Sequence, residues 1–322
     1  MNPEAPTPDA AVVVDRVSKR FDETLALDQL SFSVDYGEIF GLLGPDGAGK
    51  STLFHILTTL RVADEGNARV LGLDVVHDLW DLRSRIGYMP GRFSLYPDLS
   101  IAENLAFFAS VFGTTVAEQA ELIAPIYNQI EPFSSRRAGA LSGGMKQKLA
   151  LCCALVHRPD ILFLDEPTTG VDAVSRREFW DLLDDLRARG LTIVVSTPYM
   201  DEAHRCDRVA LLQNGRILDL DAPDRIGSRY PLPIFAISRG SRYRLLLVLR
   251  EYPHNHSVYP FGDELHYTDS RAGADPTDIA NQIREYLTGK GFDGPEVRPI
   301  TAGIEDSFME LMGAPVGEGE SS

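Results

Sequence analysis

Cysteine is scarce in this chain. Its 322 residues include three, Cys152, Cys153 and Cys206. An odd and sparse set of cysteines argues against a disulfide framework and indicates a reducing compartment. Cys152 and Cys153 lie in the apolar run ALCCALV, which favours buried, small hydrophobic side chains at both positions.

Long apolar segments are also missing. No run approaches the roughly 18–20 residues that cross a bilayer. The N-terminus, MNPEAPTPDA, lacks the basic start and apolar stretch of a signal peptide. If the protein serves a membrane, we therefore expect the spanning part to be another chain.

Basic residues are outnumbered. There are 31 Lys and Arg against 47 Asp and Glu, which gives a formal net charge of −16. So large an acidic excess argues against general nucleic-acid binding through a basic face. It would also be repelled by anionic lipid unless a local basic patch intervened. A solvated acidic surface is the simpler interpretation.

The first two thirds of the chain alternate between strand and helix patterns. Short, fully apolar runs at 161–165 and 191–196 are typical of buried parallel strands, and a long helix is predicted between them. Asn214-Gly215 favours a type I′ turn in a hairpin over 208–220. Further strands are predicted at 12–21 and 68–76, and another two lie within 30–44. Further helices are predicted at 51–60, 101–112 and 116–130.

The pattern changes near residue 226, where Gly227-Ser228 and two prolines interrupt the chain. The segments beyond, with predicted helices at 242–251 and 275–287 among short strands, indicate a small α+β domain closed by a helix at 303–312. We predict a disordered tail at 1–10, a first domain at 11–228, a second at 229–313 and a disordered tail at 314–322.

GPDGAGKS, residues 44–51, fits the phosphate-loop pattern GxxxxGK[ST] between a predicted strand and a predicted helix. Its glycines let backbone N–H groups point at phosphate oxygens, and the helix directs its positive dipole end at the same oxygens. Lys50 would hold the β- and γ-phosphates, and Ser51 would bind Mg²⁺.

ILFLDEP, residues 161–167, is an apolar strand that ends in two acids. Asp165 would then hold the Mg²⁺ shell beside the phosphate loop. Glu166 could polarise the attacking water as a general base. Many buried strands end in acidic residues, so this motif indicates a nucleotide site only because it follows a phosphate loop in the sequence.

LSGGMKQK, residues 141–148, places a hydroxyl and bare backbone N–H groups at a predicted helix start. This arrangement predicts a second anion site on the same chain. One domain cannot easily wrap both sites round one γ-phosphate, but two domains packed head to tail can. A simple serine-glycine helix cap is the alternative.

With these motifs in order, residues 12–226 resemble the nucleotide-binding domain of ABC transporters. The resemblance implies an α/β fold of the P-loop NTPase, ABC type, in which a mixed sheet core carries a helical subdomain, with the small C-terminal α+β domain following. The C-terminal part, which ends in GIEDSFMELM, is similar to the accessory domain of daunorubicin-resistance-type multidrug exporter ATPases.

The resemblance also assigns residues. It implies ATP and Mg²⁺ as ligands, with Asp172 in the loop that crosses to a partner domain. Phe21 stands where the family stacks an aromatic on adenine, although an ordinary strand-end aromatic would look the same. The implied ATP contacts within the chain are Phe21, Gly44, Pro45, Asp46, Gly47, Ala48, Gly49, Lys50, Ser51 and Thr52. Those made across the dimer are Leu141, Ser142, Gly143, Gly144 and Met145.

Two positions depart from the family. Gly91 replaces a glutamine that touches the Mg²⁺ region, and Pro198 replaces a histidine that bonds the γ-phosphate. Losing one such hydrogen bond costs roughly 10²–10³ in rate. His204 could substitute, but a solvated helix histidine is the simpler interpretation. Hydrolysis in this site is therefore expected to be slow.

The resulting functional expectation is an ATPase subunit at the cytoplasmic face of the membrane that powers a separate permease. The C-terminal resemblance favours export. We expect pairing with a second, different ABC ATPase, with a homodimer as the alternative. Arg92, Phe93, Leu95 and Tyr96 could dock the permease or pack locally. Other functional hypotheses are a non-hydrolytic regulator and a soluble ABC ATPase acting on nucleic acid or ribosomes, although no nucleic-acid partner is expected from the charge.

Overall fold

The computed structural model describes residues 9–313. Most of the predicted N-terminal tail and all of the C-terminal one lie outside these residues. The chain divides into two compact units, Met1–Pro223 and Asp224–Ser322. This division falls five residues before the predicted one, because the segment around Gly227 packs on the second unit. A Cβ built on Gly227 would lie 2.6 Å from the carbonyl oxygen of Ala302.

The first unit contains a four-stranded antiparallel sheet in the order β2-β1-β4-β5. One strand predicted over 68–76 is two strands here, because Leu71 and Gly72 both have positive φ and turn the chain. The strands are β1 (Val12–Phe21), β2 (Thr24–Val34), β4 (Glu65–Val70) and β5 (Leu73–Asp74).

A six-stranded sheet, in the order β10-β9-β3-β8-β7-β6, carries the predicted motifs. Its pairs are parallel except for β10 with β9, which form the predicted hairpin. Asn214 and Gly215 have φ values of 49° and 75°, as a type I′ turn requires. The strands are β3 (Ile39–Leu43), β6 (Ile86–Met89), β7 (Ile161–Asp165), β8 (Thr192–Thr197), β9 (Arg208–Gln213) and β10 (Arg216–Asp221).

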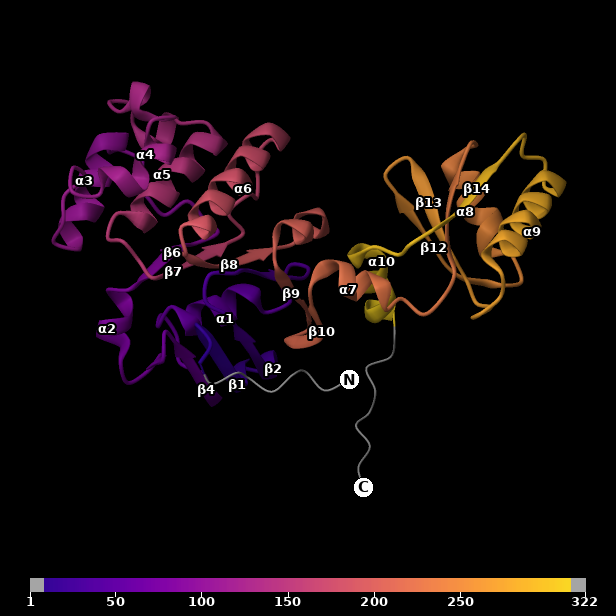
Figure 1. Ribbon diagram of the computed structural model, residues 1–322, viewed down its shortest axis with the longest axis horizontal. Coiled ribbons are helices and arrows are strands. Elements are labelled where there is room, and N and C mark those ends of the chain that lie inside the picture. Colours follow the sequence, from indigo (N-terminus) through magenta and orange to yellow (C-terminus); the bar gives the residue numbers. More distant parts are fainter. Residues whose placement is uncertain (1–8, 314–322) are drawn as a thin grey trace. The chain divides into compact units, whose positions relative to one another are not determined.

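Helix α1 (Lys50–Leu57) lies between the two sheets and joins their apolar faces (Figure 1). Phe54 meets Phe163 of β7 edge to face at 5.7 Å. Because β3, β6, β7 and β8 are parallel, their carboxyl ends meet at one edge of the sheet, where α1 begins. Ligands of open α/β sheets bind at such an edge.

The remaining helices of this unit include a group that Figure 1 shows together, α3, α4 and α5. No helix within residues 9–313 is both long and apolar enough to cross a membrane. The helices are α2 (Leu79–Arg83), α3 (Ile101–Val111), α4 (Ala120–Tyr127), α5 (Gly143–Leu155) and α6 (Ala173–Ala188), with short 3₁₀ turns η1 (Glu131–Phe133), η2 (Ala138–Ala140) and η3 (Met200–Arg205).

The second unit is built as βαββαβ with an antiparallel sheet in the order β12-β13-β11-β14, the arrangement of ferredoxin-like motifs. Helices α8 and α9 cover one face through a shared apolar core. On the other face, His266 pairs with Asp306 of α10 at 2.7 Å. The elements are α7 (Pro223–Ser228), β11 (Ile234–Ser238), α8 (Arg242–Arg250), β12 (Asn255–Phe261), β13 (Glu264–Asp269), α9 (Pro276–Gly289), β14 (Glu296–Ile300) and α10 (Ile304–Gly313).

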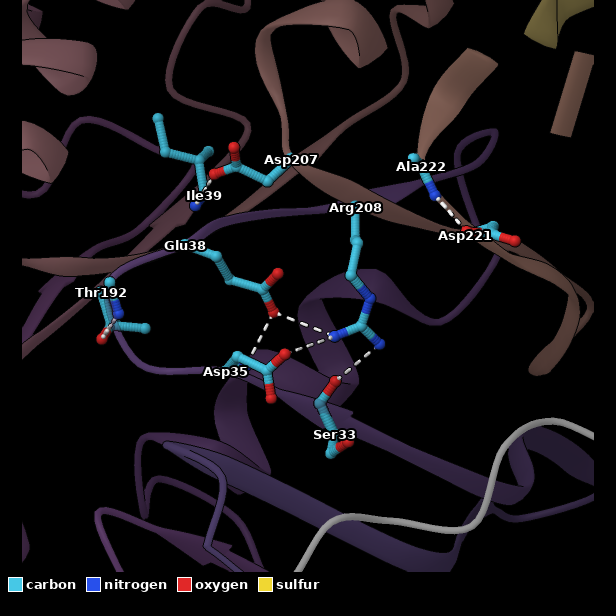
Figure 2. A network of polar contacts seen from close by, with 10 residues as sticks. Ser33, Asp35, Glu38, Ile39, Thr192, Asp207, Arg208, Asp221 and Ala222 are labelled. Carbon is cyan, nitrogen blue, oxygen red and sulfur yellow. Dashed lines mark hydrogen bonds and ion pairs between the residues drawn. The ribbon is translucent and has the colours of Figure 1, made fainter. Parts of the chain in front are cut away.

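A polar network joins the two sheets of the first unit at the end opposite the phosphate loop (Figure 2). Arg208 lies 3.3 Å from Glu38 and 3.4 Å from Asp35, and it also donates to the Ser33 carbonyl. Asp207 accepts a hydrogen bond from the Ile39 N–H at 2.9 Å. Burial raises the pKa of Glu38 to about 7, although the Asp35 N–H and Arg208 act to lower it.

Glu38→Gln is expected to remove a pH dependence of stability. The folded state holds the Glu38 proton more tightly than the unfolded chain, whose pKa is near 4.5. The stabilisation that protonated Glu38 gives the folded state is thus fully present below pH 4.5 and is lost as the pH rises through 7. It amounts to at most about 3 kcal/mol.

Tryptophan fluorescence can follow this transition, since Trp80 and Trp180 both belong to the first unit. Denaturant unfolding of wild type, Glu38→Gln and the exposed control Glu65→Gln should be compared between pH 5 and pH 8. A constant difference between wild type and Glu38→Gln across this range would contradict the prediction.

Candidate functional site

The phosphate loop joins the end of β3 to the start of α1, as predicted. Gly44 packs so tightly that a Cβ would lie 2.1 Å from the carbonyl oxygen of Leu212. Gly49 has φ of 108°, in the region that favours glycine. Both glycines are therefore required by this backbone, which presents the N-terminus of α1 to an anion.

Lys50 is the charged centre of the loop. Its side chain is 3% exposed and donates to the carbonyl oxygens of Gly44 (2.8 Å) and Pro45 (3.0 Å). It also pairs with Glu166 at 3.2 Å. An ammonium group is thus held inside the loop where the phosphates of a nucleotide are expected, and Ser51 beside it is exposed.

The two acidic residues at the end of β7, Asp165 within the strand and Glu166 directly after it, lie near the same place. Asp165 is 4% exposed and accepts a hydrogen bond from the Ser196 hydroxyl at 2.5 Å. Glu166 has φ of 49°, and its N–H donates to both the hydroxyl (3.0 Å) and the carbonyl (3.1 Å) of Ser196. A non-glycine residue in this conformation costs about 1–3 kcal/mol, so Ser196 holds the backbone that directs Glu166 toward Lys50.

Gly91 lies against these acids. A Cβ built on it would be 3.0 Å from the Asp165 carbonyl oxygen and 3.8 Å from the Cβ of Glu166. The position is therefore beside the site, and any larger residue would require the loop to shift. Nearby Tyr88 has a buried hydroxyl with no hydrogen-bond partner, and burial together with Asp165 raises its pKa well above the usual range.

Pro198 follows β8 directly and is partly buried. It supplies no side-chain donor or acceptor at a position next to Thr197. His204 lies exposed on η3.

The LSGG segment forms the start of α5, where the Ser142 hydroxyl accepts the Met145 N–H at 3.4 Å. Ser142 and Gly143 are exposed. A Cβ at Gly143 would lie 3.3 Å from the Gly170 carbonyl, and one at Gly144 would lie 2.7 Å from the Ser175 hydroxyl. The structure thus joins this segment to the loop that ends at Asp172, which caps α6 through the N–H groups of Val174 and Ser175.

Phe21 ends β1 and is partly buried. The guanidinium of Arg61 lies over its ring, 4.6 Å from the centroid, and Lys19 lies 5.8 Å away. This arrangement leaves both interpretations of Phe21 open. The ring could stack on adenine, or it could serve only in a structural cation–π contact with Arg61 and Lys19.

A cavity of about 430 Å³ opens beside Gly91 between α3, α5 and β6. Leu95 is 6% exposed and lines it, whereas Phe93 is 40% and Tyr96 47% exposed. Lys146 lies 5.3 Å from the Phe93 ring centroid. Tyr96 packs locally, edge to face with Phe107 at 4.9 Å, so Arg92, Phe93 and Leu95 are the residues of the stretch that face the cavity.

ATP and Mg²⁺ fit the residues present. The N-terminus of α1 and a buried ammonium suit phosphate, and an exposed serine with a nearby carboxylate suits Mg²⁺. The sequence analysis missed Ser196. A polar residue in the otherwise apolar strand LTIVVS was the available signal.

Comparisons with known proteins identify the family of the chain. The ABC transporter family model matches residues 27–169. A Nod factor export ATP-binding protein I of Sinorhizobium fredii is 36% identical over 309 residues, covering 95% of this chain and 87% of that protein. The chain belongs to the ATP-binding proteins of ABC transporters.

Two further relatives of this ABC protein are informative. A probable multidrug ABC transporter ATP-binding protein of Escherichia coli is 43% identical over 221 residues, 68% of this chain. The chain spans 38% of that protein's length. A solved dimeric ATP-binding cassette with bound ADP and phosphate superposes with a TM-score of 0.59 and 26% identity, over 66% of this chain and 98% of that one. The predicted ABC fold is confirmed.

Proposed function

We propose that this protein binds and hydrolyses ATP with Mg²⁺ and powers a separate membrane permease. We further propose that the resulting transporter is an exporter. The observation that carries the proposal is the convergence of Lys50, Asp165 and Glu166 at the end of the phosphate loop. The export assignment is supported by the printed names of the relatives, which include multidrug and Nod factor export proteins.

Each residue has a role in this proposal. The loop N–H groups and Lys50 bind the phosphates, Ser51 and Asp165 hold Mg²⁺, and Phe21 stacks on adenine. Mg²⁺ supplies charge neutralisation at the reacting phosphate. Glu166, held by Ser196, orients and deprotonates the attacking water.

A second ATPase subunit completes the site. The exposed Ser142 and Gly143 are free to face the nucleotide of a partner, beside Asp172. The solved relative that is dimeric supports such pairing. Gly91 and Pro198 leave this chain's own site short of two polar groups, which favours a heterodimer in which the partner's site turns over faster. Mass spectrometry of the purified complex, showing one or two kinds of ATPase chain, tests this point.

The permease is proposed to dock at the cavity beside Gly91. Apolar side chains line it, and Arg92 and Phe93 are exposed at its edge. A protruding permease segment that filled it would touch the loop next to Asp165 and so sense the nucleotide site. In this proposal the protein is bound peripherally at the cytoplasmic face of the membrane.

Arg92→Glu is expected to weaken co-purification of the permease at least about tenfold, because a reversed charge at an interface edge repels a matched partner surface. Arg69→Glu, an equally exposed arginine on β4, serves as the control. Equal recovery of permease with both variants would count against docking at this cavity.

A non-hydrolytic regulatory subunit is the second candidate, favoured by Gly91 and Pro198. ATP binding without turnover in the complete transporter would support it over hydrolysis.

A further inference from the structure

Glu202 is a buried carboxylate that the account above does not use. It lies on η3, is 2% exposed, and accepts hydrogen bonds from the hydroxyls of Thr168 (2.7 Å) and Thr197 (2.6 Å). Arg176 of α6 is 3.7 Å away and stacks on Tyr199 at 4.3 Å. Burying a charge is costly unless it is paired and hydrogen-bonded, so these contacts define its position closely.

The two threonines belong to the two segments that flank the catalytic carboxylate. Thr168 comes two residues after Glu166 and begins the loop that leads to Asp172. Thr197 ends β8 directly after Ser196, whose hydroxyl and carbonyl both hold the Glu166 N–H. The Thr197 hydroxyl also accepts the Tyr199 N–H at 3.1 Å.

We propose that Glu202 is a positioning residue for hydrolysis that fixes the end of β8 against the start of the loop before α6. Through Thr197 and Ser196 it keeps Glu166 in its left-handed conformation. Pro198 has no backbone N–H and no polar side-chain atom. The segment after β8 is therefore held by hydrogen bonds of the neighbouring residues Thr197 and Tyr199. The inference rests on the proposed ATPase function, but its first test does not.

The first test is amide hydrogen exchange on the full-length chain without nucleotide. In Glu202→Ala the amides of Glu166 and Tyr199 should exchange about tenfold faster. Their hydrogen-bond acceptors lie on Ser196 and Thr197, and Thr197 would no longer be held by Glu202. The amides of β1, which lies in the other sheet, should keep their wild-type rates. Uniform acceleration, or no change at Glu166 and Tyr199, would overturn the proposal whether or not the protein hydrolyses ATP.

The second test separates kcat from KM for ATP hydrolysis by the purified full-length chain alone, so that only this chain's own site contributes. Glu202→Ala should lower kcat about tenfold and leave the KM for ATP within about twofold. Glu202→Gln should recover most of the rate, since its amide can accept from one threonine and donate to the other. If Glu202→Ala does not fold, Thr197→Val provides the same comparison. An unchanged kcat in Thr197→Val or Glu202→Ala would overturn the proposal.

Discussion

Glu166→Gln is expected to lower the rate of ATP hydrolysis by about 10²- to 10⁴-fold, the usual contribution of a general base. The carboxylate lies 3.2 Å from Lys50, and its backbone is fixed by two acceptors on Ser196. The amide of glutamine keeps the shape but cannot take a proton from water. ATP binding should therefore persist while turnover stops.

Phosphate release by the purified chain alone, alongside titration with a fluorescent nucleotide, measures both quantities at this chain's own site. Glu178→Gln is a matched control, because Glu178 is an acid on α6 that pairs with Lys148. Turnover of the chain alone that survives Glu166→Gln would place the active base elsewhere.

Pro198→His is expected to raise hydrolysis by the isolated chain about 10²- to 10³-fold, since it supplies a missing transition-state hydrogen bond. The position directly follows Thr197 at the end of β8, where the site's strands converge. A histidine there has both a donor and an acceptor nitrogen.

Pro198→Ala is the control for this substitution, because it restores the backbone N–H without an imidazole. An increase in Pro198→Ala equal to that in Pro198→His would assign the effect to the backbone. Brisk turnover by the wild-type chain alone, abolished by Glu166→Gln, would reject the slow-site hypothesis altogether.

The phosphate loop could be predicted from sequence because its requirements are local. Gly44 and Gly49 are needed by their own backbone and immediate neighbours, and Lys50 follows at fixed spacing. The type I′ turn at Asn214-Gly215 was predictable for the same reason. The parallel strands at 161–165 and 191–196 could be predicted because most of their residues are apolar.

Contacts between distant segments could not be predicted. Nothing near Glu202 in sequence indicates that it bonds Thr168, 34 residues earlier. The closeness of Gly91 to the Asp165 carbonyl likewise depends on the pairing of β6 with β7. The packing of Gly227 against Ala302 also joins segments 75 residues apart, and nothing in the local sequence indicates it.

The central claim is that the LSGG segment of one chain covers the nucleotide held in the phosphate loop of another. Thiol crosslinking tests it most directly, with Ser142→Cys in this chain and a cysteine at Asp46, or at the matching position of the co-purified ATPase. The native cysteines are buried and burial raises their pKa values, so they should not react. In a Glu166→Gln background, we predict a crosslink between two chains that forms only with ATP bound. A crosslink within one chain, or none with ATP bound, would contradict the account.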